Sequence, residues 1–587
     1  MDSSERNIEE GTRKEKEKDA EDSNSLLYGI EDNPSIPQTV LLGFQLFLSM
    51  FSGLIVLPLI LSQFLCIKED ISVVSKIISA TFFVQGITTF LQATFGTRLP
   101  IIQGCSFSFV PPAIALLAYY GECSDDHELY NETETEEEPS WKPKLEEING
   151  GLLMAAVAET IIGVTGFVSL ILRFVGPLSI APVIIILGIS ISRISWIYCY
   201  VHWGVATFTA CLIILFTQFL KTTKVPLIGY SRGKGFHVVR SRLFLKYSMF
   251  LAILCGWMLS WVLTVSGALS NDPTERTYGA RTDINNAVFK DNEWFRLPYP
   301  GTIGWPKPTY AAFLGMLAAV MASIVESLGD YNACSLISGV RPPPLHAINR
   351  GIAMEGIGGI ISSLWGTGSG TTSYSVNVVI IGITKVASRR VTQMAAIILI
   401  LVGIFQRVCS LFATIPDPVV GGTMIATTGM LISVGISLLQ KADLNSSRNL
   451  FVLGVALFLG IMLPQFIELN PDAINTGLPT FDKCATTLLG TGMFISFIAG
   501  VILDNTVPGT LSERGLSRED YHTLSQREDG DPNEPNLPED CYDFPFGMNY
   551  LRRWNFTRYI PISPTFTGFS CGYPSKTCKQ NCEDVML

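Results

Sequence analysis

Residues 310–330 read YAAFLGMLAAVMASIVESLGD, an apolar run that carries two carboxylates near its end. A membrane-spanning helix needs roughly 20 mostly apolar residues, and this run is long enough. Similar runs recur along the chain, in which 48% of the 587 residues are hydrophobic and 16% are charged, with a mean hydropathy of +0.36. The charged share is lower, and the hydropathy higher, than in a typical water-soluble domain. We therefore predict an all-α polytopic membrane protein with about fourteen transmembrane spans.

The predicted spans fall into two sets of seven. Because seven is odd, two such halves insert in opposite orientations and form inverted repeats. The third span of each half is interrupted by polar and small residues, PIIQGCSFSFVPP at 100–112 and GTGSGTTSYSVNVV at 366–379, so two broken spans with short extended segments are expected. The spans lie near 39–61, 73–95, 101–119, 150–173, 180–199, 202–220, 246–265, 310–330, 351–366, 374–387, 391–413, 420–437, 447–468 and 484–503.

The orientation of the chain follows from its basic residues. The loop between residues 221 and 246 holds seven of them and no acidic residue, so the positive-inside rule predicts that this loop and both termini are cytosolic. Residues 1–35 are charged and poor in apolar residues, which predicts a disordered cytosolic tail; a second cytosolic tail is predicted at 510–587. The loop of residues 120–149 then lies outside, where Asn131 is the predicted glycosylation site.

Several classes of function have no support in the sequence. The formal net charge of −10 is concentrated in the acidic loop and the two tails, so nucleic-acid binding is not expected. We find no nucleophile-and-base arrangement or phosphate loop outside the apolar spans, so we predict that the chain is not an enzyme. Most of the 13 cysteines lie in apolar segments, where a thiol behaves as a small hydrophobe. No cofactor is predicted.

The two broken spans are candidates for a binding site. Unwound backbone in a membrane exposes amides and carbonyls that a ligand, an ion or water must satisfy, and half-helices that start there add positive dipole ends. The alternative is a glycine-rich packing interface between helices. The candidate residues are Gln103, Gly104, Ser106, Phe107 and Ser108 in the first segment, and Thr371, Thr372, Ser373 and Ser375 in the second.

Glu326 and Asp330 form a second candidate feature. Their spacing of i and i+4 places both carboxylates on one face of a helix, within an apolar run. Ionisable residues inside a membrane are expensive and usually functional. Two like charges about 6 Å apart repel unless a cation lies between or beside them, so a bound Na⁺ or H⁺ fits the pair. The alternative is a span that ends early and leaves both acids at the membrane interface.

Several motifs, spread from roughly residue 36 to residue 570, resemble the nucleobase and ascorbate transporter family. SRRV at 388–391, NSSRNLFVLG at 445–454 and YDFPFGM at 542–548 look most like its animal sodium-coupled members. The other matching motifs are GFQLFLSMFSG at 43–53, GPLSIAP at 176–182, ESLGDYNAC at 326–334, PPPLHAINRGI at 342–352, GITKVASRRV at 382–391, LPQF at 463–466 and LDNTVPGTLSERGL at 503–516.

The resemblance implies a transporter domain over residues 36–509, usually in a homodimer. A core domain, about 39–173 and 310–413, would move against a gate domain, about 180–265 and 420–503, in elevator-type alternating access. The two broken segments would meet at the substrate. The carboxylate matching Glu326 would bind the substrate ring, and the acid matching Asp330 would help to hold sodium.

This sequence departs from the family signature at positions that bear on the substrate. In VNVVIIGITK at 376–385, Asn377 matches the signature, but Val376 stands where relatives have Gln, Glu or Pro, and Val379 stands where they have Gly. Valine cannot supply the hydrogen bonds that Gln or Glu would offer to a purine or pyrimidine. Gln45 is followed by Leu46, where many relatives have His, so a further polar group is missing.

We predict a secondary active transporter in a lipid bilayer that couples the entry of sodium to the transport of a small flat polar solute. The departures and the animal-type motifs favour ascorbate; a sodium- or proton-coupled nucleobase symporter is the alternative, followed by an anion exchanger or channel, or a transport-inactive relative. The sequon and the family indicate the plasma membrane. Sodium is expected at Asp330, Ser106 and Thr372, and the substrate at Glu326, Gln45, Ser106, Phe107, Ser373, Ser375 and Asn377.

Overall fold

The computed structural model describes residues 26–67, 70–118, 120, 139–168, 174–231, 235–284, 293–470, 473–510, 513–515 and 539–566. Asn131, the predicted glycosylation site, lies outside these residues. Eight of the described helices are long and apolar enough to cross a membrane. They are α2 (Ile36–Phe64), α3 (Ile71–Thr94), α5 (Trp141–Thr165), α7 (Pro177–Val201), α10 (Ser248–Val265), α12 (Tyr310–Ile337), α17 (Asp417–Leu438) and α18 (Ser447–Leu469).

Two bent helix pairs raise the number of candidate spans to ten. These are α15 (Arg389–Ile404) with α16 (Gln406–Ala413), bent by 83°, and α19 (Pro479–Gly490) with α20 (Gly492–Thr506), bent by 76°. The remaining predicted spans contain shorter or more polar helices: α4 (Val110–Ala118), α8 (Trp203–Ile214), α13 (Leu345–Trp365) and α14 (Ser375–Thr384). The prediction of a multi-pass membrane protein is confirmed, and the number of fourteen spans stays a prediction.

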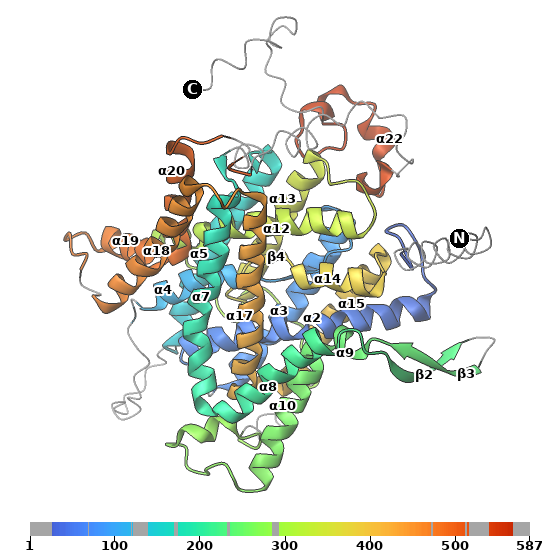
Figure 1. Ribbon diagram of the computed structural model, residues 1–587, viewed down its shortest axis with the longest axis vertical. Helices are drawn as coiled ribbons and strands as arrows, with labels where there is room; N and C mark the ends of the chain where they lie inside the picture. Colours follow the sequence, from blue (N-terminus) through green and yellow to red (C-terminus); the bar gives the residue numbers. More distant parts are fainter. Residues whose placement is uncertain are drawn as a thin grey trace, which may run out of the picture.

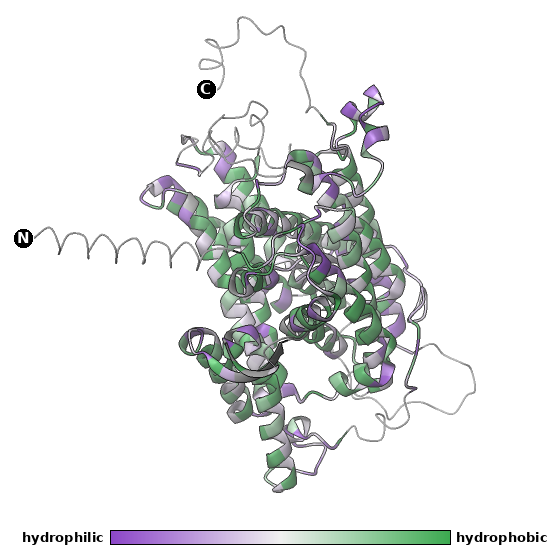
Figure 2. Ribbon diagram, turned by 90° about the vertical axis from the view of Figure 1, so that its right-hand side faces the viewer, coloured by the Kyte–Doolittle hydropathy of each residue, from purple (hydrophilic) through white to green (hydrophobic). Residues whose placement is uncertain are grey.

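The helices pack in pairs that join the two halves of the sequence. Helices α7 and α17 run side by side (Figure 1), and α5 packs on α13 and α3 on α15. Small residues allow this approach: a Cβ on Gly163 of α5 would lie 2.4 Å from the backbone nitrogen of Ala353 in α13. Helices in lipid associate through such close backbone contacts. Most residues of the helices are hydrophobic (Figure 2).

Two small antiparallel sheets interrupt the helices. Strand β1 (Gln103–Cys105) pairs with β4 (Thr371–Ser373), so the two predicted broken segments meet. Strands β2 (Val225–Ser231) and β3 (Gly235–Ser241) form a hairpin in the basic loop after the sixth predicted span. The all-α prediction is wrong for this loop, because the apolar and β-branched residues of its two strands favour extended structure.

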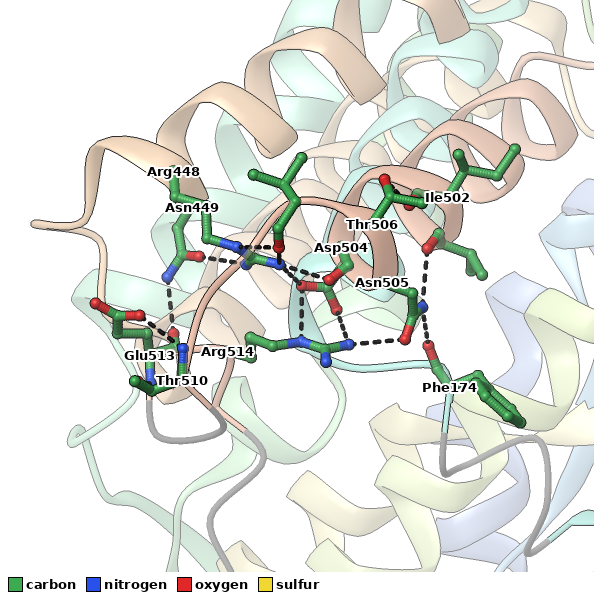
Figure 3. Close-up of polar contacts among 12 residues, drawn as sticks. Phe174, Arg448, Asn449, Ile502, Asp504, Asn505, Thr506, Thr510, Glu513 and Arg514 are labelled. Carbon is green, nitrogen blue, oxygen red and sulfur yellow. Dashed lines mark hydrogen bonds and ion pairs between the residues drawn. The ribbon is translucent and has the colours of Figure 1, made fainter. Parts of the chain in front are cut away.

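A buried ion-pair cluster joins α18 to the end of α20 (Figure 3). The side chain of Asp504 is 0% exposed and accepts hydrogen bonds from Arg448 Nη2 and Arg514 Nη2, each at 3.0 Å. Arg448 also donates to the backbone oxygen of Val507, at 3.0 Å from Nη2. These contacts therefore hold the chain after α20 against the start of α18.

Two segments from the predicted N- and C-terminal tails are folded against the helices. Residues 26–35 form the N-terminal segment, in which Tyr28 makes an isolated parallel bridge with Val386. Its order differs from the disordered tail predicted over residues 1–35, because Ile30 is buried in the hydrophobic core, Tyr28 packs against that core, and main-chain hydrogen bonds hold the segment. Residues 539–566 form the C-terminal segment, with the short helices η5 (Glu539–Tyr542), α22 (Met548–Leu551) and η6 (Asn555–Tyr559). Cys66, just after α2, is disulfide-bonded, which the sequence did not predict.

Candidate functional site

The paired strands β1 and β4 form the centre of the candidate site. Gln103 lies opposite Ser373, and Gly104 lies opposite Thr372. Each strand has only three residues and is followed by a helix that starts nearby, η1 (Phe107–Phe109) leading into α4 on one side and α14 on the other. Backbone groups at the start of these helices have no partner within the helix, so they can serve a ligand.

Both predicted carboxylates lie on α12 and contact these two segments. Ser106 Oγ donates to Glu326 Oε2 over 3.5 Å, and Ser375 Oγ donates to Asp330 Oδ2 over 3.1 Å. Each broken segment therefore supplies one hydroxyl to one carboxylate. Helix α12 continues past both acids to Ile337, so the pair does not mark the end of the helix.

An unpredicted carboxylate, Glu355 of α13, lies behind the paired strands. Its Oε1 accepts hydrogen bonds from Tyr331 at 2.7 Å, Ser373 at 2.7 Å and Gln103 at 3.3 Å. Its Oε2 accepts one from Ser327 at 2.6 Å. Glu355 therefore ties β1, β4 and α12 together, and it fixes the residues on which the candidate site is built.

Tyr374 is a second residue that the sequence did not single out. Its ring fills the space between α2 and β1: a Cβ on Gly104 would lie 2.1 Å from the ring, and a Cβ on Gly53 would lie 1.8 Å from its hydroxyl. Only glycine fits at both positions with this ring in place. The Tyr374 hydroxyl has no hydrogen-bond partner among the described residues.

The site is open on the side of Gly329. Apart from its chain neighbours and the backbone of its own helix, no heavy atom of the described residues lies within 4 Å of the place that a Cβ on Gly329 would take. Glu326 is half-buried, and the side chain of Val376 is 37% exposed. Glu326 and Val376 are therefore both partly accessible.

The structure brings some of the predicted site residues together and separates others. Thr372 Oγ1 contacts Ser327 Oγ at 3.0 Å rather than Asp330, so Ser375 is the hydroxyl beside that acid. Asn377 is fully buried and donates to the backbone oxygen of Pro100 at 2.7 Å, which is a structural contact. Phe107 follows Ser106 in η1 and is half-buried. Gln45 is buried on α2, and no contact joins it to either acid among the described residues.

The described residues offer oxygen rather than nitrogen or sulfur ligands at this site. No group of three or more His, Cys, Asp or Glu side chains in the described part of the chain is arranged to hold a metal ion. Sodium is a hard cation that carboxylate, hydroxyl and carbonyl oxygens suit, as they do the hard cations Mg²⁺ and Ca²⁺. Asp330 with Ser375, and Glu326 with Ser106, provide oxygens of this kind.

Comparisons with known proteins agree with this arrangement. The profile described as "Permease family" (Xan_ur_permease) matches residues 37–469. Solute carrier family 23 member 1 of Rattus norvegicus is 42% identical over 555 residues, which cover 94% of this chain and 91% of the relative. Solute carrier family 23 member 2 of Homo sapiens is 40% identical, covering 93% and 83%. Nucleobase-ascorbate transporter 1 of Arabidopsis thaliana is 31% identical, covering 89% and 96%.

These relatives are transporters and not enzymes, and they match nearly the whole of this chain. Most of the motifs that suggested a resemblance lie within residues 37–469, including the segment around Glu326 and Asp330, whereas those at 503–516 and 542–548 follow this region. The chain therefore belongs to the permease family and, within it, to the nucleobase and ascorbate transporters.

Proposed function

We propose that this protein is a sodium-coupled symporter that accumulates ascorbate. The observation that carries the proposal is the pair Glu326 and Asp330, each in contact with a hydroxyl from a different broken segment and next to the open side at Gly329. Sodium would bind between Asp330 and Ser375 and organise β4 and α14. Glu326 would accept hydrogen bonds from the hydroxyl groups of the solute.

Sodium supplies the energy for uphill transport. Each sodium ion that enters down a 100 mV membrane potential contributes about 2.3 kcal/mol, before its concentration gradient is added. Because ascorbate is an anion at neutral pH, a sodium ion bound near Asp330 would also offset the repulsion from Glu326. Coupling and binding would thus depend on the same ion.

The packing of the helices supports fourteen spans in two inverted repeats. If the predicted spans are numbered in chain order, inverted repeats relate each span of the first half to the span seven places later. Exchanging the related spans turns the contact of α5 with α13 into that of α15 with α3. The same exchange turns α12 with α5 into α2 with α15, and α18 with α20 into α8 with α10. It leaves β1 with β4 and α7 with α17 unchanged. We propose that a core and a gate domain built on this symmetry move in elevator-type alternating access, within a homodimer.

We propose that the protein lies in the plasma membrane with both termini in the cytosol. Cys66 at the end of α2 is disulfide-bonded, and disulfides persist in oxidising compartments. An end of α2 on the outside is the orientation that the basic loop of residues 221–246 also favours.

A nucleobase is the second candidate substrate. Relatives named as nucleobase-ascorbate transporters support it, and Glu326 could accept a ring N–H directly. The exposed, apolar Val376 argues for ascorbate, because a nucleobase edge would find no hydrogen-bond partner there.

Uptake into cells tests these alternatives. Labelled ascorbate, uracil and hypoxanthine would be offered in sodium medium and in choline medium, and we expect sodium-dependent accumulation of ascorbate. Glu326→Gln and Asp330→Asn should each abolish accumulation at normal surface expression. Glu468→Gln is the matched control, because this acid lies on the exposed end of α18 and contacts only Arg193 among the described residues.

Each other result points to a different function. Accumulation of uracil or hypoxanthine instead of ascorbate would identify a nucleobase symporter. Sodium-dependent uptake in a Glu326→Gln, Asp330→Asn double variant would rule out the proposed site. Chloride-dependent currents would indicate an exchanger or channel, and ligand binding without accumulation would indicate a transport-inactive relative.

A further inference from the structure

Three arginines form a buried cluster at one end of the helices that carry the candidate site. The arginine cluster consists of Arg98, after α3, Arg350 in α13 and Arg389 at the start of α15. Arg350 is 2% exposed, and the other two are also buried. Burial, followed by the charge of Arg389, lowers the pKa of Arg98 to about 10, so this side chain is still cationic at neutral pH. Buried cations require acceptors or anions close by.

The C-terminal segment supplies these acceptors. The backbone oxygen of Cys541 accepts from Arg389 Nη2 at 3.0 Å, and that of Tyr542 accepts from Arg350 Nη2 at 2.7 Å. The Tyr542 hydroxyl donates to the backbone oxygen of Arg341 at 2.6 Å. Figure 1 places α22, which follows these residues, next to the end of α13.

An aromatic ring completes the contact. The Arg350 guanidinium lies 4.5 Å from the centre of the Phe544 ring, a cation–π geometry. Asp543, the residue before this ring, forms an ion pair within the segment, with Arg552 at 3.1 Å. The segment thus offers two adjacent carbonyls and an aromatic ring to the cluster.

The N-terminal segment also binds Arg389. Glu31 Oε1 lies 2.9 Å from Arg389 Nη1, and the backbone nitrogen of Arg389 donates to Ile30 O at 3.2 Å. Upstream, the nitrogens of Leu27 and Tyr28 both donate to the backbone oxygen of Lys385. Arg389 therefore holds both terminal segments at the loop between α14 and α15.

This loop is one short helix away from the candidate site. Helix α14 has 10 residues and rises about 15 Å, and its first residue, Ser375, contacts Asp330. The helix ends at Thr384, and the next residue, Lys385, has a left-handed φ of 59° and accepts main-chain hydrogen bonds from the N-terminal segment. A shift of the loop would therefore be transmitted along a rigid helix to Ser375.

We propose that the C-terminal segment is a dissociable ligand of the arginine cluster, and that its docking holds α14 where Ser375 meets Asp330. Residues 516–538 connect the segment to the chain that leaves α20, so it binds at the high effective concentration of a tethered ligand. The effect on the site rests on the proposed function, whereas the docking itself does not.

The docking is tested by cleaving the chain within residues 516–538, which connect the C-terminal segment to the rest of the protein. A site-specific protease sequence is inserted between residues 525 and 526 of the full chain, which carries a C-terminal tag. After cleavage in detergent, the tagged fragment should co-elute with the membrane domain in size-exclusion chromatography. Tyr542→Ala with Phe544→Ala should reduce the co-eluting fraction roughly tenfold or more, because one hydrogen bond and the cation–π contact are lost.

The matched control is Tyr550→Ala with Phe556→Ala, two aromatic residues of the same segment that are 70% and 56% exposed. The control fragment should be retained like the unmodified one. Loss of the unmodified fragment on cleavage, or equal retention of both double variants, would overturn the docking.

The effect on the site is read from sodium rather than from uptake. The sodium concentration that gives half of the thermal stabilisation should rise on the order of fivefold when the segment is released. An unchanged value after verified release would overturn the connection through α14. If sodium stabilises neither form, the proposed coupling ion fails, while the co-elution result still decides the docking.

Discussion

Glu355 receives four hydrogen bonds from four side chains, and these bonds connect to further ones. Tyr331 donates to Glu355 and accepts from Gln92 Nε2 at 2.7 Å. Ser373 donates to Glu355 and accepts from Gln103 Nε2 at 3.1 Å. Because all four side chains donate their hydrogen bonds to the Glu355 carboxylate, an acceptor is required at position 355.

Replacing Glu355 by Gln should therefore be destabilising, although the side chains have the same size. The new amide group would place a donor against other donors, and leaving a buried polar group unsatisfied costs about 1–3 kcal/mol. We expect a lower thermal midpoint in detergent and loss of uptake. Tyr331→Phe, which removes one donor only, should have the smaller effect. A Glu355→Gln protein as stable as Tyr331→Phe would show that the network does not depend on the acceptor.

The residues of the site differed in how far the sequence revealed them. Glu326 and Asp330 were predicted because ionisable side chains are rare inside apolar spans. The same rule applies to Glu355 in the run GIAMEGIGGI at 351–360, so its signal was present and was overlooked. Tyr374 gave no signal, since an aromatic residue in an apolar span is ordinary. Its role depends on Gly53 and Gly104, which are distant in sequence and meet it only in the fold.

At the scale of elements, the cluster around Asp504 determines how α18 and α20 are joined. Asp504→Asn should destabilise the protein by about 3–5 kcal/mol, because it leaves the charges of Arg448 and Arg514 without a buried counter-charge. Thermal unfolding in detergent would measure this. Thr506→Val is the control, because the Thr506 hydroxyl bonds only within its own helix, to Ile502 O, among the described residues. Equal midpoints for the two variants would contradict a structural role for the cluster.

The elements themselves were predicted to different degrees. Polar and small residues within apolar spans correctly indicated two extended segments, at 100–112 and 366–379, although spacing alone could not give their pairing register. The hairpin of β2 and β3 was missed because the basic residues of its loop were used for topology only. The order of residues 26–35 was missed because the charged residues before them dominate the composition of the tail. The segment buries Ile30 in the core and forms main-chain hydrogen bonds with the loop after α14.

At the scale of the whole molecule, the candidate site joins elements from both halves of the chain. The first half contributes β1 and Ser106, and the second contributes α12, β4 and α14. A ligand that binds there holds the two halves together, so its binding energy adds to the stability of the folded protein. Stability therefore reports on occupancy of the site without any assumption about transport.

Sodium should accordingly raise the thermal midpoint of the purified protein. A ligand at 100 times its dissociation constant stabilises the folded state by about 2.7 kcal/mol, which for a large chain corresponds to a shift on the order of 2–5 °C. Melting curves in sodium and in choline at equal ionic strength would measure it, since non-specific screening is then the same in both. Asp330→Asn should remove the shift, because it takes away the carboxylate nearest to Ser375, whereas Glu468→Gln should keep it. A shift that persists in Asp330→Asn would place the sodium ion elsewhere in the molecule, and the coupling mechanism would then have to be built on other oxygens.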